Sequence, residues 1–321
     1  MYKIYDLWPQ IAKNSYGDNN PIDYKNIDHI VFAGMGGSGA IGDIFSAILS
    51  KSSIHVSLVK GYHLPKTVDI STLVVATSVS GNTVETLTVL NSAKKTGCKL
   101  IGFSSGGKME KYCKKNKIEF RNIPKIHSPR ASFVSYVYST LGTLNSVIPI
   151  KKHDILESIS KISKISKQID SNNLSKSNPS LDLAKWISGI PLIYYPWGLQ
   201  AAATRFKNSL QENAKSHAMI EDVIESSHNG IVSWERQSAV KPILLRGKND
   251  YVKTKERWKI LKEYFEKNNI AYKEVISVNG SILSKLLCLI YMLDYASIYH
   301  AVLNNTDPSP VVPIDFVKAR L

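Results

Sequence analysis

The chain has 321 residues, of which 43% are hydrophobic and 21% are charged, and its formal net charge is +15. This composition is typical of a soluble globular protein and excludes a disordered or fibrous one. The length predicts two domains of about 150 residues each. Three widely spaced cysteines, Cys98, Cys113 and Cys288, argue against a disulfide framework or a Cys-x-x-Cys metal site and favour a reducing cytoplasm.

The positive charge indicates either a lysine-rich solvated surface or long-range attraction of an anionic substrate. Nucleic acid is not an expected partner, because no recognition motif or basic–aromatic array accompanies the charge. Residues 1–15 lack the apolar segment of a secretory signal peptide.

The first half of the chain alternates between apolar strand patterns and helical patterns. Strands are predicted at 29–34, 54–59, 72–77, 99–103 and 118–123, and helices at 40–51, 84–96 and 132–147. Gly97 is the residue type that commonly ends a helix. The alternation predicts an α/β domain, residues 1–150, with a parallel sheet covered by helices.

The pattern breaks over 151–182, which we expect to be an interdomain linker made of a helix and then a loop. A second α/β domain is expected at 183–321, similar in fold to the first but diverged in sequence. Its strands are predicted at 191–195, 242–246 and 273–276, and its helices at 199–212, 254–268 and 282–303.

The helix at 282–303 is apolar enough to resemble a membrane span, but Lys285, Asp294 and His300 interrupt it. Each charge at a bilayer centre costs roughly 2.5–3.5 kcal/mol on insertion scales. A helix that is apolar on most faces is better buried in a core or a subunit interface. We therefore expect a core helix and no membrane association.

A glycine turn, GMGGSG at 34–39, lies between the first strand and the first helix and formally matches GxGxxG. A dinucleotide site would also need an acidic residue about twenty positions further on. Residues 54–60 contain none, although Lys60 is compatible with a 2′-phosphate. The alternatives are a phosphate-binding turn, a dinucleotide site and a tight turn without a ligand.

A loop with three hydroxyl side chains follows the third strand. Ser78, Ser80 and Thr83 surround Gly81 at the predicted start of a helix, where free backbone N–H groups and the helix dipole favour an anion. This predicts a phosphate site. The alternative is an ordinary helix cap made by Ser80 or Thr83 alone.

The sequence SVSGNTVET at 78–86 resembles the phosphate loop of sugar isomerase (SIS) domains. Together with GMGGSGAIGD, GYHLP, SGGK and PRAS, it is similar to the archaeal-type bifunctional phosphoglucose/phosphomannose isomerases. The resemblance implies two three-layer αβα SIS domains. It implies interconversion of glucose 6-phosphate, and of mannose 6-phosphate, with fructose 6-phosphate through a cis-enediol. The implied phosphate ligands are Ser38, Ser78, Ser80 and Thr83, and the other implied substrate contacts are Gly36, Gly37 and Pro129.

The same resemblance assigns four catalytic residues. Glu212 is the base that moves a proton between C1 and C2, and His228, sixteen residues later, assists ring opening. Arg130 stabilises the enediolate, and Lys318 in the tail assists ring opening. The plainer alternatives are a solvated helix glutamate, a turn histidine, a surface ion pair and a frayed tail lysine.

In the wider phosphoglucose isomerase family the histidine reaches in from a neighbouring subunit, so a homodimer sharing His228 is expected. No metal or cofactor is required. Ser309 stands where relatives more often have threonine, which bears on acceptance of mannose 6-phosphate. The rival function is a non-catalytic sugar-phosphate sensor, which would keep the three loop hydroxyls without needing the four catalytic residues.

Overall fold

The computed structural model describes residues 1–17 and 20–320, which divide into two compact units, Lys3–Ile159 and Ser160–Arg320. The boundary falls inside helix α7 (Lys152–Ile169), within the stretch interpreted above as a linker. Leu321, the last residue of the expected second domain, lies outside the described residues.

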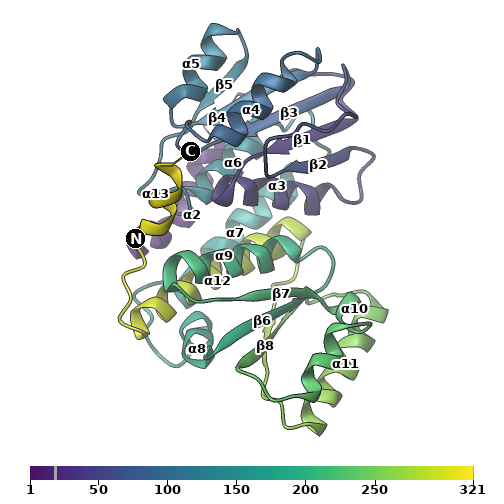
Figure 1. The fold of residues 1–321 in the computed structure, drawn as a ribbon, viewed down its shortest axis with the longest axis vertical. Helices are drawn as coiled ribbons and strands as arrows, with labels where there is room; N and C mark the ends of the chain where they lie inside the picture. Colours follow the sequence, from purple (N-terminus) through teal and green to yellow (C-terminus); the bar gives the residue numbers. More distant parts are fainter. Residues whose placement is uncertain (18–19, 321) are drawn as a thin grey trace. The chain divides into compact units, whose positions relative to one another are not determined.

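Unit 1 is built on a parallel sheet with the strand order β2-β1-β3-β4-β5 (Figure 1). The strands are β1 (His29–Ala33), β2 (His55–Val59), β3 (Thr72–Thr77), β4 (Lys99–Ser104) and β5 (Glu119–Asn122). Each predicted strand of this half is confirmed to within one residue at either end. Strands β1 and β3 are buried along their whole length, as their unbroken apolar pattern predicted.

Helices cover both faces of this sheet. The helices of this unit are α1 (Tyr2–Asp6), α2 (Trp8–Gly17), α3 (Gly36–Leu49), α4 (Val84–Ala93), α5 (Gly107–Lys115) and α6 (Phe133–Thr143), and α2 packs against α6. The chain moves one way across the sheet from β1 to β2 and the other way from β3 to β5. Because crossover connections are right-handed, α3 lies on one face with α6, and α4 and α5 lie on the other. Helices α1, α2 and α5 were not predicted.

Unit 2 repeats this architecture with the parallel strand order β7-β6-β8-β9. Its strands are β6 (Ile190–Tyr195), β7 (Met219–Asp222), β8 (Val240–Arg246) and β9 (Lys273–Ile276). Strand β6 therefore corresponds to β1 and β8 to β3. The predicted α/β class with two parallel sheets is confirmed, while the edge strand β7 was missed.

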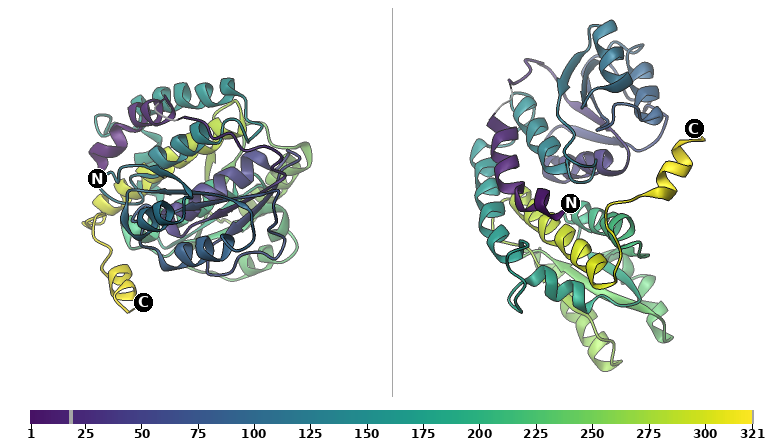
Figure 2. Two further views of the ribbon diagram at one scale, coloured as in Figure 1. Left: turned by 90° about the horizontal axis from the view of Figure 1, so that it is seen from above. Right: turned by 90° about the vertical axis from the view of Figure 1, so that its left-hand side faces the viewer.

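The helices of unit 2 are α8 (Pro179–Trp186), α9 (Gln200–Ala214), α10 (Val223–Ser226), α11 (Val252–Lys267), α12 (Ile282–Leu303) and α13 (Val312–Lys318), with a 3-10 helix at Gly230–Glu235. Helices α8 and α9 pack against α12, and α11 covers the opposite face of the sheet. A tail leaves the end of α12 as an extended segment before α13 (Figure 2).

Helix α12 has the length and composition of a membrane span, yet almost every residue from Leu283 to Ala301 is buried in the fold. This agrees with the core helix expected from its interrupting polar residues.

A polar cluster lies at the amino end of β1. His29 is buried, with Nε2 2.9 Å from Ser57 Oγ and Nδ1 3.3 Å from Thr72 Oγ1. The ring centroid of His55 is 4.8 Å from that of His29. Burial, followed by the proximity of His55, lowers the pKa of His29, against smaller opposing effects of Asp28 and Asp69. The folded chain therefore keeps His29 neutral to a lower pH than the unfolded chain does.

We expect the free energy of unfolding to fall as the pH drops below about 6.5, because the unfolded chain then binds a proton that native His29 takes up only at lower pH. Above that pH the contribution is fully present. His29→Gln removes this titration, so the variant should lose less stability on acidification. Urea unfolding above and below this pH measures the difference. His153→Gln, at an exposed histidine, is the control and should behave like wild type. Equal acid losses in wild type and His29→Gln would contradict the assignment.

Candidate functional site

The carboxyl ends of β1 and β3 mark the point in unit 1 where the strand order reverses, which is where open α/β sheets form a ligand crevice. The glycine turn follows β1 and the hydroxyl loop follows β3. Ser38, in the first turn of α3, is buried, and its Oγ accepts a hydrogen bond from Val79 N at 3.3 Å. The structure therefore joins the two loops that the sequence placed in one site.

The glycines of the turn allow close packing of backbone. A Cβ on Gly39 would lie 2.8 Å from Gly34 O, and one on Gly37 would lie 3.4 Å from Pro129 O. Gly36 has a φ of +53°, a conformation that favours glycine. The turn thus brings Gly37 beside the segment that carries Pro129 and Arg130.

Lys60, the residue compatible with the 2′-phosphate of a dinucleotide, forms an ion pair with Asp43. Its Nζ lies 2.6 Å and 2.7 Å from the two carboxylate oxygens of Asp43 on α3. This ion pair neutralises the lysine at the end of β2. The glycine pattern is therefore explained by packing of α3 on the strands, and the dinucleotide reading loses its remaining support.

In the hydroxyl loop, buried Ser78 and the α4 N-cap residue Thr83 hydrogen-bond to each other, with their oxygens 2.8 Å apart. The Thr83 side chain makes no capping hydrogen bond to α4, which argues against the plain helix-cap reading. Ser80 is exposed, and its Oγ accepts from Asn82 N at 3.2 Å. The three hydroxyls flank Gly81 just before α4, and binding of an anion there stays a prediction.

The connection from β4 to α5, residues 104–108, braces the hydroxyl loop. Ser105 N and Oγ both donate to Val79 O, and Lys108 N donates to Asn82 Oδ1 at 3.0 Å. Gly81 has a φ of +67°, and a Cβ there would lie only 1.8 Å from Gly106 O. The bracing explains why the SGGK segment accompanies the hydroxyl motif.

Gly81→Ala should displace one of these loops, because an added Cβ overlaps Gly106 O and left-handed backbone is itself unfavourable for alanine by roughly 1–2 kcal/mol. We expect sugar-phosphate affinity to fall at least about tenfold. Isothermal titration with fructose 6-phosphate measures it. Gly61→Ala is the matched control, because a Cβ at Gly61 meets nothing within 4 Å. Unchanged affinity in Gly81→Ala would contradict a rigid phosphate loop.

In unit 2, Glu212 is half-buried in the last turn of α9. Its C-cap residue is Lys215, which has a φ of +54°. Lys215 Nζ donates to Glu212 O at 2.8 Å and to Asp307 O at 3.0 Å. Lys215 thus links α9, the helix on which Glu212 lies, to the start of the C-terminal tail.

His228 lies in the turn after α10, beyond the carboxyl end of β7, and is exposed. Glu212 lies before the amino end of the same strand. Because α9 runs antiparallel to β6 and β7, the two residues sit at opposite edges of the unit 2 sheet. One chain therefore does not bring its own Glu212 and His228 together within unit 2.

Arg130 is buried, in the loop between β5 and α6, and Lys318 is the exposed last residue of α13. The loop after β8, which corresponds to the hydroxyl loop of unit 1, carries Asp250 instead. Its Oδ2 accepts from Gly247 N at 3.1 Å and from Trp258 Nε1 at 2.9 Å. In this loop the backbone N–H of Gly247 is therefore hydrogen-bonded to the loop's own Asp250 carboxylate.

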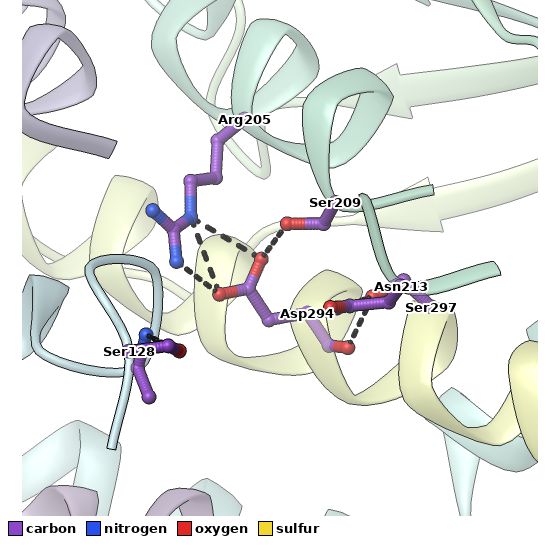
Figure 3. Close-up of polar contacts among 7 residues, drawn as sticks. Ser128, Arg205, Ser209, Asn213, Asp294 and Ser297 are labelled. Carbon is purple, nitrogen blue, oxygen red and sulfur yellow. Dashed lines mark hydrogen bonds and ion pairs between the residues drawn. The ribbon is translucent and has the colours of Figure 1, made fainter. Parts of the chain in front are cut away.

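Sequence reasoning treated Asp294 only as an interruption in an apolar helix and did not single out Arg205. The structure pairs them between α9 and α12, with both side chains buried and Arg205 Nη2 2.7 Å from Asp294 Oδ2 (Figure 3). A charge within a buried helix needs a partner, and that rule was the available signal.

Comparison with known proteins agrees with this architecture. Residues 23–145 match the SIS domain family, and residues 176–321 match the bacterial phospho-glucose isomerase C-terminal SIS domain. The chain is thus a double-SIS-domain protein, the class that the paired sheets and the hydroxyl loop define. More particularly, it belongs to the bifunctional phosphoglucose/phosphomannose isomerase family.

Full-length relatives establish that membership. The bifunctional phosphoglucose/phosphomannose isomerase of Caldicellulosiruptor bescii is 32% identical, with 99% of this chain and 97% of the relative covered. That of Aquifex aeolicus is 31% identical over 98% and 94%. A D-glucosamine-6-phosphate 4-epimerase of Sulfolobus acidocaldarius is 28% identical over 74% of each chain.

Solved structures support the fold. Tagatose-6-phosphate ketose/aldose isomerase from Escherichia coli superposes with a TM-score of 0.73 at 12% identity, covering 96% of this chain and 93% of that one.

Proposed function

We propose that this protein interconverts glucose 6-phosphate and mannose 6-phosphate with fructose 6-phosphate. The observation that carries the proposal is the braced hydroxyl loop, in which Ser78, Ser80 and Thr83 surround the start of α4. Hydroxyl and amide donors suit a phosphate that stays bound while chemistry occurs elsewhere on the sugar. Ser38 belongs to the same phosphate site, and Gly36, Gly37 and Pro129 to its sugar side.

Glu212 is the base in this scheme. From the open-chain aldose it takes the C2 proton while the C1 carbonyl oxygen gains a proton, which gives the cis-enediol. The C2 hydroxyl then loses its proton as the C2 carbonyl forms, and Glu212 returns its proton to C1. The proton that the C1 oxygen gains is matched by the proton that the C2 oxygen loses, and Glu212 ends each cycle as a carboxylate. Because C1 is reduced as C2 is oxidised within one molecule, no outside oxidant or reductant is needed.

Three further residues assist the base. Arg130 has a fixed positive charge suited to the enediolate oxygens. His228 exchanges the proton of the ring oxygen during ring opening, and Lys318 supports the same step from the tail. The tether of Lys215 to Asp307 supports the role of the tail, because the tail starts beside the last turn of α9.

The active unit in this proposal is a homodimer in which His228 comes from the partner subunit. Support comes from the placement of Glu212 and His228 at opposite edges of one sheet. None of the three cysteines, all within the described residues, forms a disulfide, which suits the cytoplasm as the place of the reaction.

A coupled assay tests the function. Purified protein is supplied with glucose 6-phosphate, mannose 6-phosphate or glucosamine 6-phosphate, each with and without chelator. We expect fructose 6-phosphate from the first two sugars, with equal rates in chelator. No turnover by folded dimer would favour the sensor, and activity at C4 of glucosamine 6-phosphate alone would favour the epimerase chemistry named for one relative. Loss of activity with chelator would overturn the metal-free mechanism.

A further inference from the structure

One face of α9 is joined to α12 by side-chain hydrogen bonds over two turns (Figure 3). Arg205 Nε lies 3.3 Å and 3.2 Å from the two carboxylate oxygens of Asp294, and Nη2 lies 2.7 Å from Oδ2. Ser209 Oγ donates to Asp294 Oδ1 at 2.6 Å. Asn213 Nδ2 donates to Ser297 Oγ at 2.8 Å, and Ser297 Oγ donates to Asp294 O at 2.6 Å. Residues spaced by four on α9 thus meet residues one turn apart on α12.

The network is buried: the side chain of Arg205 is 3% exposed and that of Asp294 is 0% exposed. A buried ion pair is weak evidence for stability, because a well-packed apolar pair of similar size is often as stable or more so. An apolar contact between two helices tolerates sliding and rotation, whereas a bidentate guanidinium–carboxylate pair fixes direction and register. The network therefore specifies how α9 sits on α12.

The specified face includes Glu212. At about 100° per residue, position 212 lies within about 20° of position 205 around the α9 axis. Glu212 also directly precedes Asn213, whose amide is bound to Ser297. Rotation or sliding of α9 would move the Glu212 carboxylate directly. A mutation far from the reacting atoms that misplaces a catalytic group by about 1 Å can lower the rate ~10²-fold.

We propose that the buried Arg205–Asp294 pair, with Ser209 and the Asn213–Ser297 bond, positions Glu212 for proton transfer. These are positioning residues, and they act through the rotation and register of α9. The inference rests on the proposed function of Glu212 as the base.

The test exchanges the pair for apolar side chains. Arg205→Met/Asp294→Leu should keep a urea midpoint at or above that of wild type, since the charges leave together. We expect kcat to fall about tenfold to 100-fold while KM stays within about twofold, because phosphate binding lies in unit 1. Arg246→Met/Glu274→Leu removes another arginine–carboxylate pair of unit 2, with its atoms 3.0 Å apart, and should keep wild-type kcat.

Wild-type kcat in the stable double variant would show that the pair is only structural and would overturn the proposal. If the double variant does not fold, Ser209→Ala and Ser297→Ala decide. The first removes one hydrogen bond and the second removes two, and both leave the ion pair in place. They should fold and lower kcat without raising KM, and unchanged kcat in both would overturn the proposal. Loss of the proposed function itself is recognised separately, by an inactive wild type or a fully active Glu212→Gln.

Discussion

Glu212→Gln is expected to lower kcat for isomerisation by about 10²–10⁴, the usual worth of a positioned general base. The amide has nearly the shape of the carboxylate but cannot accept the C2 proton. KM should change little, because the proposed phosphate site is the hydroxyl loop of unit 1 and does not include α9. The coupled assay gives both constants. Transfer of solvent deuterium to C2 of the recovered aldose gives an independent measure of proton abstraction.

Glu263→Gln is the matched control for this variant, since Glu263 is an exposed glutamate on α11 paired with Lys267. It should be fully active. If Glu212→Gln keeps more than about a tenth of the wild-type kcat, Glu212 is not the base, because removing one costs at least about 10²-fold.

Asp294→Ala is expected to lower the free energy of unfolding by about 3–5 kcal/mol, the usual cost of removing one partner of a buried ion pair. The substitution leaves the Arg205 guanidinium in the interior without the carboxylate that now receives three of its contacts. Ser209 loses its acceptor at the same time. Urea denaturation followed by circular dichroism measures the loss.

Glu274→Ala is the control with which the loss of unfolding free energy in Asp294→Ala is compared. Glu274 pairs with Arg246 and Lys262 in a partly exposed setting, where an ion pair contributes about 0–1 kcal/mol. Asp294→Ala should be several times more damaging. A loss of less than about 1 kcal/mol would mean that water or side-chain rearrangement compensates the stranded guanidinium.

The strands and phosphate loops could be read from the sequence because their signals are local. Strands such as 72–77 are continuous apolar runs, and the loop hydroxyls stand within six residues of each other. The start of α3 at Gly36 was missed, since glycine is a poor helix former. Here the close approach of α3 to Gly34 requires glycine regardless of propensity. Strand β7 was missed because it is a four-residue edge strand with the sequence Met-Ile-Glu-Asp.

The Arg205–Asp294 network could not be predicted in the same way, because its partners are 89 residues apart in the chain. Asp294 within an apolar helix predicts a positively charged partner, but the local sequence does not identify Arg205 among the many basic residues. The position of His228 beyond the carboxyl end of the sheet likewise follows from β7, a strand that was not predicted from the sequence. Long-range pairing and edge strands thus limited prediction of the site more than they limited prediction of the fold.

The divergence between the two corresponding loops has a consequence for stoichiometry. The loop after β3 presents hydroxyls at the start of α4, whereas the loop after β8 closes on itself through Asp250. The four strands of unit 2 follow the order of β2-β1-β3-β4 in unit 1, yet only unit 1 offers the hydroxyl side chains proposed to bind phosphate. A titration should therefore saturate at one sugar phosphate per chain, and a dimer should take up two.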